Sequence, residues 1–295
     1  MPEGDTVWLA ASRMHAALAG QPLTGTDFRV PALATTDLAG RDVLEVVPRG
    51  KHMLTRIEGG LTLHTHFRMD GTWHLYRPGQ RWSGGAAWQI RAVLRNSQWA
   101  AVGYRLPVLE LLPTAEEEAV VGHLGPDLLG PDWDETAAVR RITGQPERDI
   151  AEALLDQRNL AGIGNLYKTE ALFLRGLSPW TPVGEVDDVR ALVALARRLM
   201  LANRDRWEQV TTGNARNGEH HWVFERAGAP CRRCGTSVLS AEQGRPPQQR
   251  LSYWCPSCQR GPTPLPEELR SQEQRRQAAR SVRQMPRATR GRYVP

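Results

Sequence analysis

The four cysteines are the feature that most constrains this chain, because they form two closely spaced pairs. Cys231 is followed by Cys234, Cys255 is followed by Cys258, and 20 residues separate the two pairs. Four thiolates at this spacing satisfy the tetrahedral coordination of Zn²⁺, and a closed shell of four sulfurs holds a structural ion rather than a catalytic one. The sequence therefore predicts one structural zinc ion that clamps a small hairpin, and it argues against disulfides.

Arginines lie on or beside this predicted hairpin, at Arg245, Arg250 and Arg260. A rigid hairpin is well suited to hold a guanidinium fork against a phosphate group. Taken alone, this combination makes nucleic acid one candidate partner among several.

The net charge does not locate a nucleic-acid surface on the body of the protein. The chain of 295 residues carries a net charge of +6, but residues 270–295 contain eight arginines and one glutamate, so the remainder sums to about −1. Residues 263–295 show no apolar periodicity, and we predict a basic, disordered tail there. Lysine occurs only at Lys51 and Lys168, and arginine supplies every other basic side chain. We therefore expect a specific role for Lys51, whereas the presence of a lysine at position 168 is more simply explained by chance.

The first 113 residues have the pattern of a helix followed by strands. Asp5-Thr6 offers an N-cap for a helix over residues 7–18, which Gly20 and Pro22 end. Segments with strand character follow at 43–47, 53–57, 61–66, 90–94 and 108–112, between glycine and proline clusters. In segment 61–66, Leu61 and Leu63 would point to one face of a strand and His64 and His66 to the other, as a half-buried strand requires. We expect a β-sandwich.

From Thr114 the pattern becomes helical, with candidate helices at 135–142, 149–157, 166–174 and 187–203. No run of about 18 apolar residues occurs, and the start of the chain lacks the basic-then-apolar pattern of a signal peptide. We therefore expect no membrane insertion, a location in the cytosol and nucleoid, and a monomer.

Pro2 and Glu3 form a candidate catalytic pair at the start of the chain. Removal of Met1 would expose the secondary amine of Pro2 beside a carboxylate. An α-amino group titrates near pH 7.7–8, so a useful fraction is already a free nucleophile, and such amines form Schiff bases with sugar aldehydes. The alternative is that Pro2 and Glu3 are an ordinary solvent-exposed chain start with no catalytic role.

A glycine-rich turn, Gly162-Ile163-Gly164-Asn165, lies between two predicted helices. Its glycines permit close backbone approach, and the following helix presents free amide groups to an anion. The alternative is a simple corner with Asn165 as N-cap.

Together these motifs resemble the formamidopyrimidine-DNA glycosylase and endonuclease VIII family over residues 1–260. The resemblance is closer to endonuclease VIII of the actinobacterial type. It rests on Pro2-Glu3-Gly4, Arg49-Gly50-Lys51, Leu155-Asp156-Gln157 before the glycine-rich turn, Pro230-Cys231 with Cys234, and Tyr253-Trp254-Cys255-Pro256 with Cys258 and Gln259.

The resemblance implies an α+β fold: an N-terminal helix plus β-sandwich, a helix-two-turn-helix domain and a C-terminal zinc-finger hairpin. The expected domains are 1–113 (catalytic sandwich), 114–212 (helix-two-turn-helix), 213–262 (lesion-loop region and zinc finger) and 263–295 (tail).

The resemblance also implies roles for individual residues. Pro2 would attack the sugar, Glu3 would act as acid and base, and Lys51 would contact the target nucleotide. Asn165 and Arg250 would grip phosphates beside the lesion. Met69 is the candidate wedge that fills the vacated base stack, with core packing as its alternative.

Two departures from the family pattern bear on specificity. The formamidopyrimidine branch carries Arg-Arg-Phe-Gly where this chain has Val102-Gly103-Tyr104-Arg105, and Arg68 and Asp70 replace the usual wedge partners of endonuclease VIII. The polar loop 211–221 lies in the lesion-pocket region without an assignable residue.

The implied function is a bifunctional DNA glycosylase and AP lyase of base excision repair. It would remove oxidised bases, with pyrimidines favoured, from damaged double-stranded DNA through a Schiff base at Pro2, and cut the strand by β/δ-elimination. The alternative is a catalytically silent zinc-finger protein that binds DNA or RNA on the same fold. A metal-dependent nuclease is disfavoured because no carboxylate cluster suits Mg²⁺.

Overall fold

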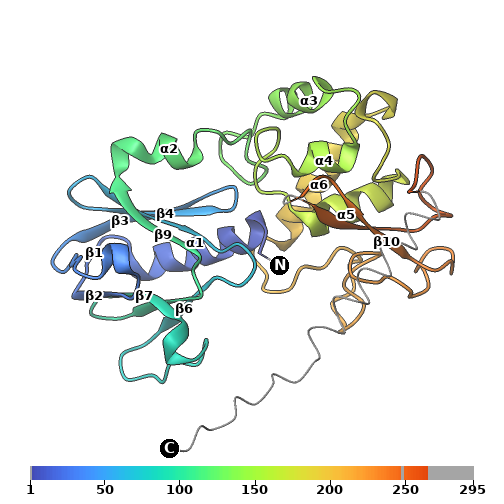
Figure 1. Cartoon of the computed structure of the whole chain (residues 1–295). Helices are drawn as coiled ribbons and strands as arrows, with labels where there is room; N and C mark the ends of the chain where they lie inside the picture. Colours follow the sequence, from blue (N-terminus) through green and yellow to red (C-terminus); the bar gives the residue numbers. More distant parts are fainter. Residues whose placement is uncertain (1, 247–248, 265–295) are drawn as a thin grey trace, which may run out of the picture.

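The structure, a computed structural model, describes residues 2–246 and 249–264 (Figure 1). The predicted tail lies outside the described residues, apart from its first two positions. No helix in the described part of the chain is long and apolar enough to cross a membrane.

Two antiparallel sheets pack together in the N-terminal half. One has the order β1-β3-β4-β5-β9 and the other the order β2-β7-β8-β6. The strands of the first sheet are β1 (Gln21–Pro22), β3 (Asp42–Arg49), β4 (His52–Ile57), β5 (Leu61–His66) and β9 (Val108–Pro113). Those of the second are β2 (Gly25–Phe28), β6 (Thr72–Tyr76), β7 (Ile90–Arg95) and β8 (Ala100–Tyr104). The predicted sandwich is confirmed.

Helix α1 (Gly4–Leu18) lies along the sandwich and shares its core, with its N-terminal end pointing toward the helical half (Figure 1). The helix begins at Gly4, not at Val7 as the sequence predicts. Glu3 occupies the N-cap position but makes no side-chain cap hydrogen bond, and Asp5 is buried. The predicted cap at Asp5-Thr6 is wrong because both carboxylates have partners in the helical half.

Strand β5 is buried on both faces, so the prediction of a half-buried strand is also wrong. Its Thr62 donates to the Glu117 carboxylate at 2.6 Å, and a ring nitrogen of His64 lies 2.8 Å from one of His52. Glu117 begins α2 (Glu117–Val121), so the segment leaving the sandwich folds back over this face and covers its polar side chains.

The helical half contains α3 (Glu135–Thr143), α4 (Ile150–Leu155), α5 (Asn165–Arg175) and α6 (Val189–Asn203) around a core of their own. Asp134 and Asp188 cap α3 and α6 by accepting backbone hydrogen bonds at 2.9 and 2.8 Å. Short 3₁₀ turns occur at η1 (Pro31–Leu33), η2 (Ala87–Gln89), η3 (Thr114–Glu116) and η4 (Val183–Glu185).

The last described elements are β10 (Leu239–Gln243) and β11 (Arg250–Trp254), which pair antiparallel. This hairpin packs against α5, so the cysteine-bearing segment is attached to the helical half (Figure 1). The predicted α+β architecture is confirmed in all three parts.

Candidate active site

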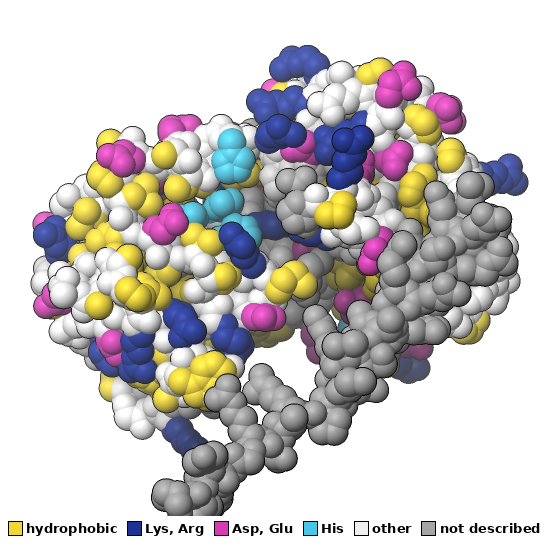
Figure 2. All heavy atoms as spheres, in the orientation of Figure 1, with side chains coloured by type: hydrophobic (Ala, Val, Ile, Leu, Met, Phe, Trp, Pro, Cys, Tyr) yellow, Lys and Arg dark blue, Asp and Glu magenta, His cyan; other side chains and the backbone are white. Residues whose placement is uncertain are grey.

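A cleft of about 1110 Å³ separates the sandwich from the helical half and the hairpin. Figure 2 shows the hollow, with histidine side chains gathered on its sandwich side. Predicted site residues from both halves line it, namely Pro2, Lys51, Met69, Asn165 and Arg250. Lys168, for which the sequence predicts no role, lines it too. The fold thus brings residues separated by most of the chain to one place.

Glu3 lies at the junction of the two halves and is fully buried. Its carboxylate accepts hydrogen bonds of 2.7 Å from the backbone N–H groups of Gly164 and Leu166, at the start of α5. A side chain at position 164 would collide with Glu3, because a Cβ there would lie 2.4 Å from its carboxyl carbon. The second glycine of the turn therefore makes room for this carboxylate.

Burial raises the pKa of Glu3 to about 7, against the opposing effect of the Lys51 charge, which lowers it. The nearby Asp5 carboxylate also raises it. A carboxyl group that titrates near neutral pH can both donate and accept a proton, as a general acid and base must.

Lys51 lies in the tight turn between β3 and β4. Gly50 adopts a left-handed conformation with φ of +57°, and its N–H donates to the Asp127 carboxylate at 2.6 Å. Asp127 also accepts from the N–H of Leu129, so this carboxylate ties the lysine turn to the helical half. Burial lowers the pKa of Lys51, and the Glu3 charge raises it.

Asn165 is the first residue of α5, but Gly164 occupies the N-cap position. The Asn165 amide donates to the carbonyl of Leu251 in the hairpin at 2.8 Å, and its buried carbonyl oxygen has no partner among the described residues. The alternative of a simple N-cap is therefore wrong. Arg250, the first residue of β11, is exposed at the same cleft.

Lys168 is fully buried on α5, one turn beyond Asn165. Its ammonium donates to the Ser252 hydroxyl at 2.9 Å, which donates to Gln243, whose amide donates to Asp149. Burial lowers the pKa of Lys168 to about 7, the Glu3 charge raises it and Arg250 lowers it. A fully buried ammonium is costly, so chance retention does not explain this lysine.

Met69 lies in the turn after β5 and is 63% exposed at the mouth of the cleft. The alternative that it packs in the core is wrong. Its neighbour Arg68 has a φ of +47°, and the Arg105 guanidinium donates to the carbonyl of Asp70 at 3.1 Å. The turn is thus held in a fixed shape with the methionine outward.

Glu170 organises the polar loop 211–221, a role that sequence reasoning missed. Its buried carboxylate accepts from the N–H groups of Trp222, Val223 and Phe224 at 2.8–2.9 Å and from the Thr211 hydroxyl. A glutamate within the buried stretch of a helix is the one sequence signal that could have indicated such an anchor.

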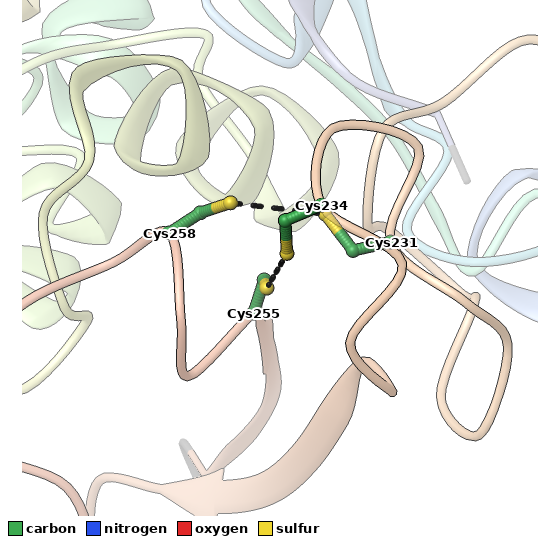
Figure 3. A group of neighbouring side chains, drawn as sticks. All are labelled: Cys231, Cys234, Cys255 and Cys258. Carbon is green, nitrogen blue, oxygen red and sulfur yellow. Dashed lines mark hydrogen bonds between the residues drawn. The ribbon is translucent and has the colours of Figure 1, made fainter.

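The four cysteine sulfurs lie within 4.8 Å of one another (Figure 3). Those of Cys234 and Cys255 are 3.4 Å apart, and those of Cys231 and Cys258 are 4.0 Å apart. These separations are too long for disulfides. Four sulfurs at about 2.3 Å from a tetrahedral Zn²⁺ would lie about 3.8 Å from one another, so the cluster fits such an ion.

The sandwich, the helix-two-turn-helix half and the four-cysteine hairpin, arranged around one cleft, define the class of DNA glycosylases that also cleave abasic sites. Residues 1–105 match the family model of the formamidopyrimidine-DNA glycosylase N-terminal domain, and residues 124–200 match that of its H2TH domain. The chain belongs to the formamidopyrimidine-DNA glycosylase and endonuclease VIII family.

Among known proteins, endonucleases 8 of actinobacteria are close relatives, which confirms the predicted branch. A probable endonuclease 8 2 of Streptomyces coelicolor is 60% identical over 90% of this chain and 96% of its own length. The DNA-(apurinic or apyrimidinic site) lyase Nei2 of Mycolicibacterium smegmatis is 44% identical over 88% of this chain and 99% of its own.

Among solved structures, the Lactococcus lactis Fpg bound to abasic-site DNA superposes with a TM-score of 0.72 at 19% identity, over 88% of this chain and all of the other. A MutM complex with DNA containing carbocyclic 8-oxo-G gives the same TM-score at 20% identity, over 88% of this chain and 100% of that one. At these identities the likeness confirms the fold.

Proposed function

We propose that this protein excises oxidised bases, with pyrimidines favoured, from damaged double-stranded DNA and then cuts the strand at the resulting abasic site. The observation that carries the proposal is the position of Pro2 at the cleft, next to a Glu3 carboxyl whose pKa lies near 7. The preference for pyrimidines is what the resemblance to endonuclease VIII implies.

The proposed chemistry begins at the Pro2 nitrogen. Its lone pair forms a bond to the sugar C1′, the bond from C1′ to the base breaks, and the departing base takes a proton. Opening of the sugar ring gives an iminium, a Schiff base between proline and C1′. Loss of a C2′ proton then expels the 3′ phosphate in β-elimination, and a further elimination expels the 5′ phosphate. Glu3 moves protons in these steps.

DNA binding is assigned to both walls of the cleft. Lys51 contacts the target nucleotide, Asn165 and Arg250 hold flanking phosphates, and Met69 fills the stack that the flipped nucleotide leaves. The exposed guanidinium of Arg250 supports its assignment, since it is available to a phosphate, and Asn165 lines the same cleft at the start of α5.

A structural Zn²⁺ is assigned to Cys231, Cys234, Cys255 and Cys258, on the sulfur separations described above. The ion fixes the hairpin and supplies no catalytic step. The domain boundaries expected from sequence, 1–113, 114–212, 213–262 and 263–295, complete the proposal, with a monomer acting in the cytosol and nucleoid.

Borohydride trapping on an abasic duplex tests the function. Reduction of the iminium should leave a covalent protein–DNA adduct that maps to Pro2. An uncleaved amino-terminal tag should abolish trapping, because it converts the amine to an amide, whereas a carboxy-terminal tag should be tolerated. Trapping and cleavage at the native rate with a blocked amino terminus would place the nucleophile elsewhere, with Lys51 the first candidate.

The same experiment separates the alternative function. Absence of any adduct on lesion and abasic duplexes, with correctly processed zinc-loaded protein, would favour a catalytically silent protein that binds DNA or RNA on this fold.

A further inference from the structure

Trp88 differs from the other tryptophans of the chain. The chain has ten tryptophans, and nine of them are buried or have an aromatic or arginine partner: Trp8, Trp73, Trp82, Trp99, Trp133, Trp180, Trp207, Trp222 and Trp254. Trp88 is 75% exposed, and no described residue stacks on its ring. An exposed indole of this kind leaves apolar surface in water that a ligand can cover.

The exposure of Trp88 is not the result of a loose loop. Trp88 lies in η2, where three arginines from separate parts of the sandwich hold three consecutive residues. Arg29 donates to the carbonyl of Ala87 at 3.2 Å, Arg91 to that of Trp88 at 2.9 Å, and Arg105 to the Gln89 side chain at 2.9 Å. The ring is therefore presented outward by a braced turn.

The segment before η2 is packed just as tightly. The Tyr76 hydroxyl accepts from the N–H groups of Ser83 and Gly84 at 3.1 and 2.8 Å. A Cβ at Gly84 would lie 2.6 Å from the Tyr104 ring, so the backbone rests directly on the sheet. A fixed platform loses little conformational freedom when a ligand stacks on it.

The charge around Trp88 favours an anionic partner. Arg29 forms an ion pair with Asp27 at 2.8 Å, but Arg91 and Arg105 have no carboxylate partner within the described chain. Arg91 contacts the backbone carbonyl of Trp88 and Arg105 contacts the side chain of Gln89, so two guanidinium groups without a carboxylate partner adjoin the turn that carries the indole. This is the composition of a site that stacks a base and attracts its phosphate.

The turn is also continuous with the cleft. The Arg105 guanidinium that holds Gln89 also donates to the carbonyl of Asp70, in the turn that carries Met69. One side chain thus fixes the position of η2 relative to the turn at the cleft mouth. A DNA strand bound along the Met69 turn would therefore lie close to η2.

We infer that Trp88, with Arg91 and Arg105, is a stacking site for an unpaired base of the DNA strand that runs past the Met69 turn. Bases inside a duplex present no free face, whereas an unpaired base does, and base–aromatic stacking tolerates any base. The inference rests on the proposed function, since DNA must occupy the cleft, and it extends the binding surface beyond the cleft.

The test uses the full-length, zinc-loaded protein and two probes with the same stable tetrahydrofuran abasic analogue. One duplex is paired throughout, and the other leaves three thymines of the opposing strand unpaired beside the analogue. Trp88→Ala should lose on the order of tenfold in affinity for the unpaired probe and keep its affinity for the paired one. Trp88→Phe should retain most of the binding, because it keeps an aromatic face.

Trp207→Ala is the matched control, because Trp207 is 66% exposed but is covered by Arg13 at 4.2 Å. It should bind both probes as the wild type does. Equal binding of Trp88→Ala and wild type to the unpaired probe, or an equal loss on both probes, would overturn the inference. Failure of the wild type to bind either probe would instead refute the proposed function, and this inference with it.

Discussion

Glu3 and Lys168 are fully buried ionisable residues, and neither has an ion-pair partner within 4.0 Å in the described chain. Burial shifts their pKa values in opposite directions to a similar point, up to about 7 for Glu3 and down to about 7 for Lys168. A protein interior tolerates such groups mainly where a ligand or a proton-transfer step uses them. Lys168 lines the cleft, and Glu3 is buried directly behind Pro2, which lines it too.

The first prediction concerns the pH dependence of Glu3. The carboxyl is protonated below about pH 7 in the free protein, so kcat/KM for base excision should fall as the pH rises above that value. Glu3→Gln should abolish this fall of kcat/KM at high pH and reduce the rate of base excision by about 10²–10⁴-fold. Single-turnover rates on a lesion duplex between pH 5 and 9 would measure both effects.

Cleavage of a preformed abasic site is the control for Glu3→Gln, because that substrate has no base to expel. We expect its cleavage to be impaired less than base excision. Equal losses on the two substrates would contradict a role for Glu3 in base departure.

The second prediction concerns Lys168. In the unfolded chain this amine stays protonated up to its ordinary pKa of 10.5, whereas the folded protein releases the proton near pH 7. The unfolded state therefore binds more protons between these values, and the contribution of Lys168 to stability rises with pH across that window. Lys168→Met should stabilise the protein by a few kcal/mol at pH 6 and much less at pH 10, as thermal unfolding would show.

Lys168→Met should at the same time weaken binding to an abasic-analogue duplex by about tenfold, because a DNA phosphate would supply the missing counter-ion. Lys168→Arg keeps the charge and is the matched control for stability. A methionine variant that is less stable at pH 6 and binds DNA normally would show that the lysine is structural.

At the scale of elements, α5 organises the helical side of the site. Its first turn receives the Glu3 carboxylate, Asn165 and Lys168 contact the hairpin, and Glu170 holds the loop that begins at Thr211. A shift of this helix would displace Glu3, Asn165, Lys168 and the loop at Thr211 together, and with them the proposed catalytic and DNA-binding groups.

The third prediction tests the hairpin as an element. Cys255→Ser combined with Cys258→Ser should remove two of the four sulfurs, release the metal and destabilise the hairpin, since structural zinc contributes directly to folding. Because Arg250 lies on β11, lesion-duplex affinity should be lost. Far-UV circular dichroism should show that the rest of the protein stays folded, and unchanged lesion binding would refute the dependence.

The sequence predicts one sheet far better than the other. Segments 43–47, 53–57, 61–66 and 108–112 correspond to β3, β4, β5 and β9, whereas β7 alone is found in the second sheet. Strand β8 is missed because alanine and glycine have weak β propensity. Gly103 is also closely packed, since a Cβ there would lie 2.5 Å from the Leu106 side chain and 3.2 Å from the Trp73 ring.

Some site residues can likewise be predicted from the sequence and others cannot. Motifs indicate Pro2, Glu3 and the cysteines, because each carries its chemistry in a short segment. Asp127 and Glu170 escape prediction because their roles depend on contacts with residues 77 and 41–54 positions away. Such pairings arise only when the two halves meet and the loop folds back.

At the scale of the whole molecule, the two halves are joined by hydrogen bonds that leave little freedom at the cleft floor. The N–H of Gly4 donates to the carbonyl of Gly162 at 2.9 Å, and Asp127 holds Gly50 from the other half. A Cβ at Gly4 would lie 3.0 Å from the Gly162 Cα. The backbone contact itself places Pro2 next to the helical half.

The fourth prediction concerns the net charge of the whole chain, most of which comes from residues outside the described part. Residues 271–295 carry seven arginines and one glutamate, so their deletion should flatten the slope of log affinity against log salt. The slope changes by about 0.9 for each DNA phosphate that the protein no longer neutralises. Specificity for lesion over intact duplex should be unaltered, and an unchanged slope would show that this segment does not bind DNA.

The exposed position of Cys234 has a consequence for cells under oxidative stress. Peroxides convert accessible thiolates to sulfenic acids, and a sulfur that is oxidised no longer serves as a metal ligand. The reagents that create oxidised bases would thus also release the metal that we assign to the hairpin. The active fraction of the protein would then fall as the oxidant dose rises, and it would recover as cellular thiols reduce the sulfur.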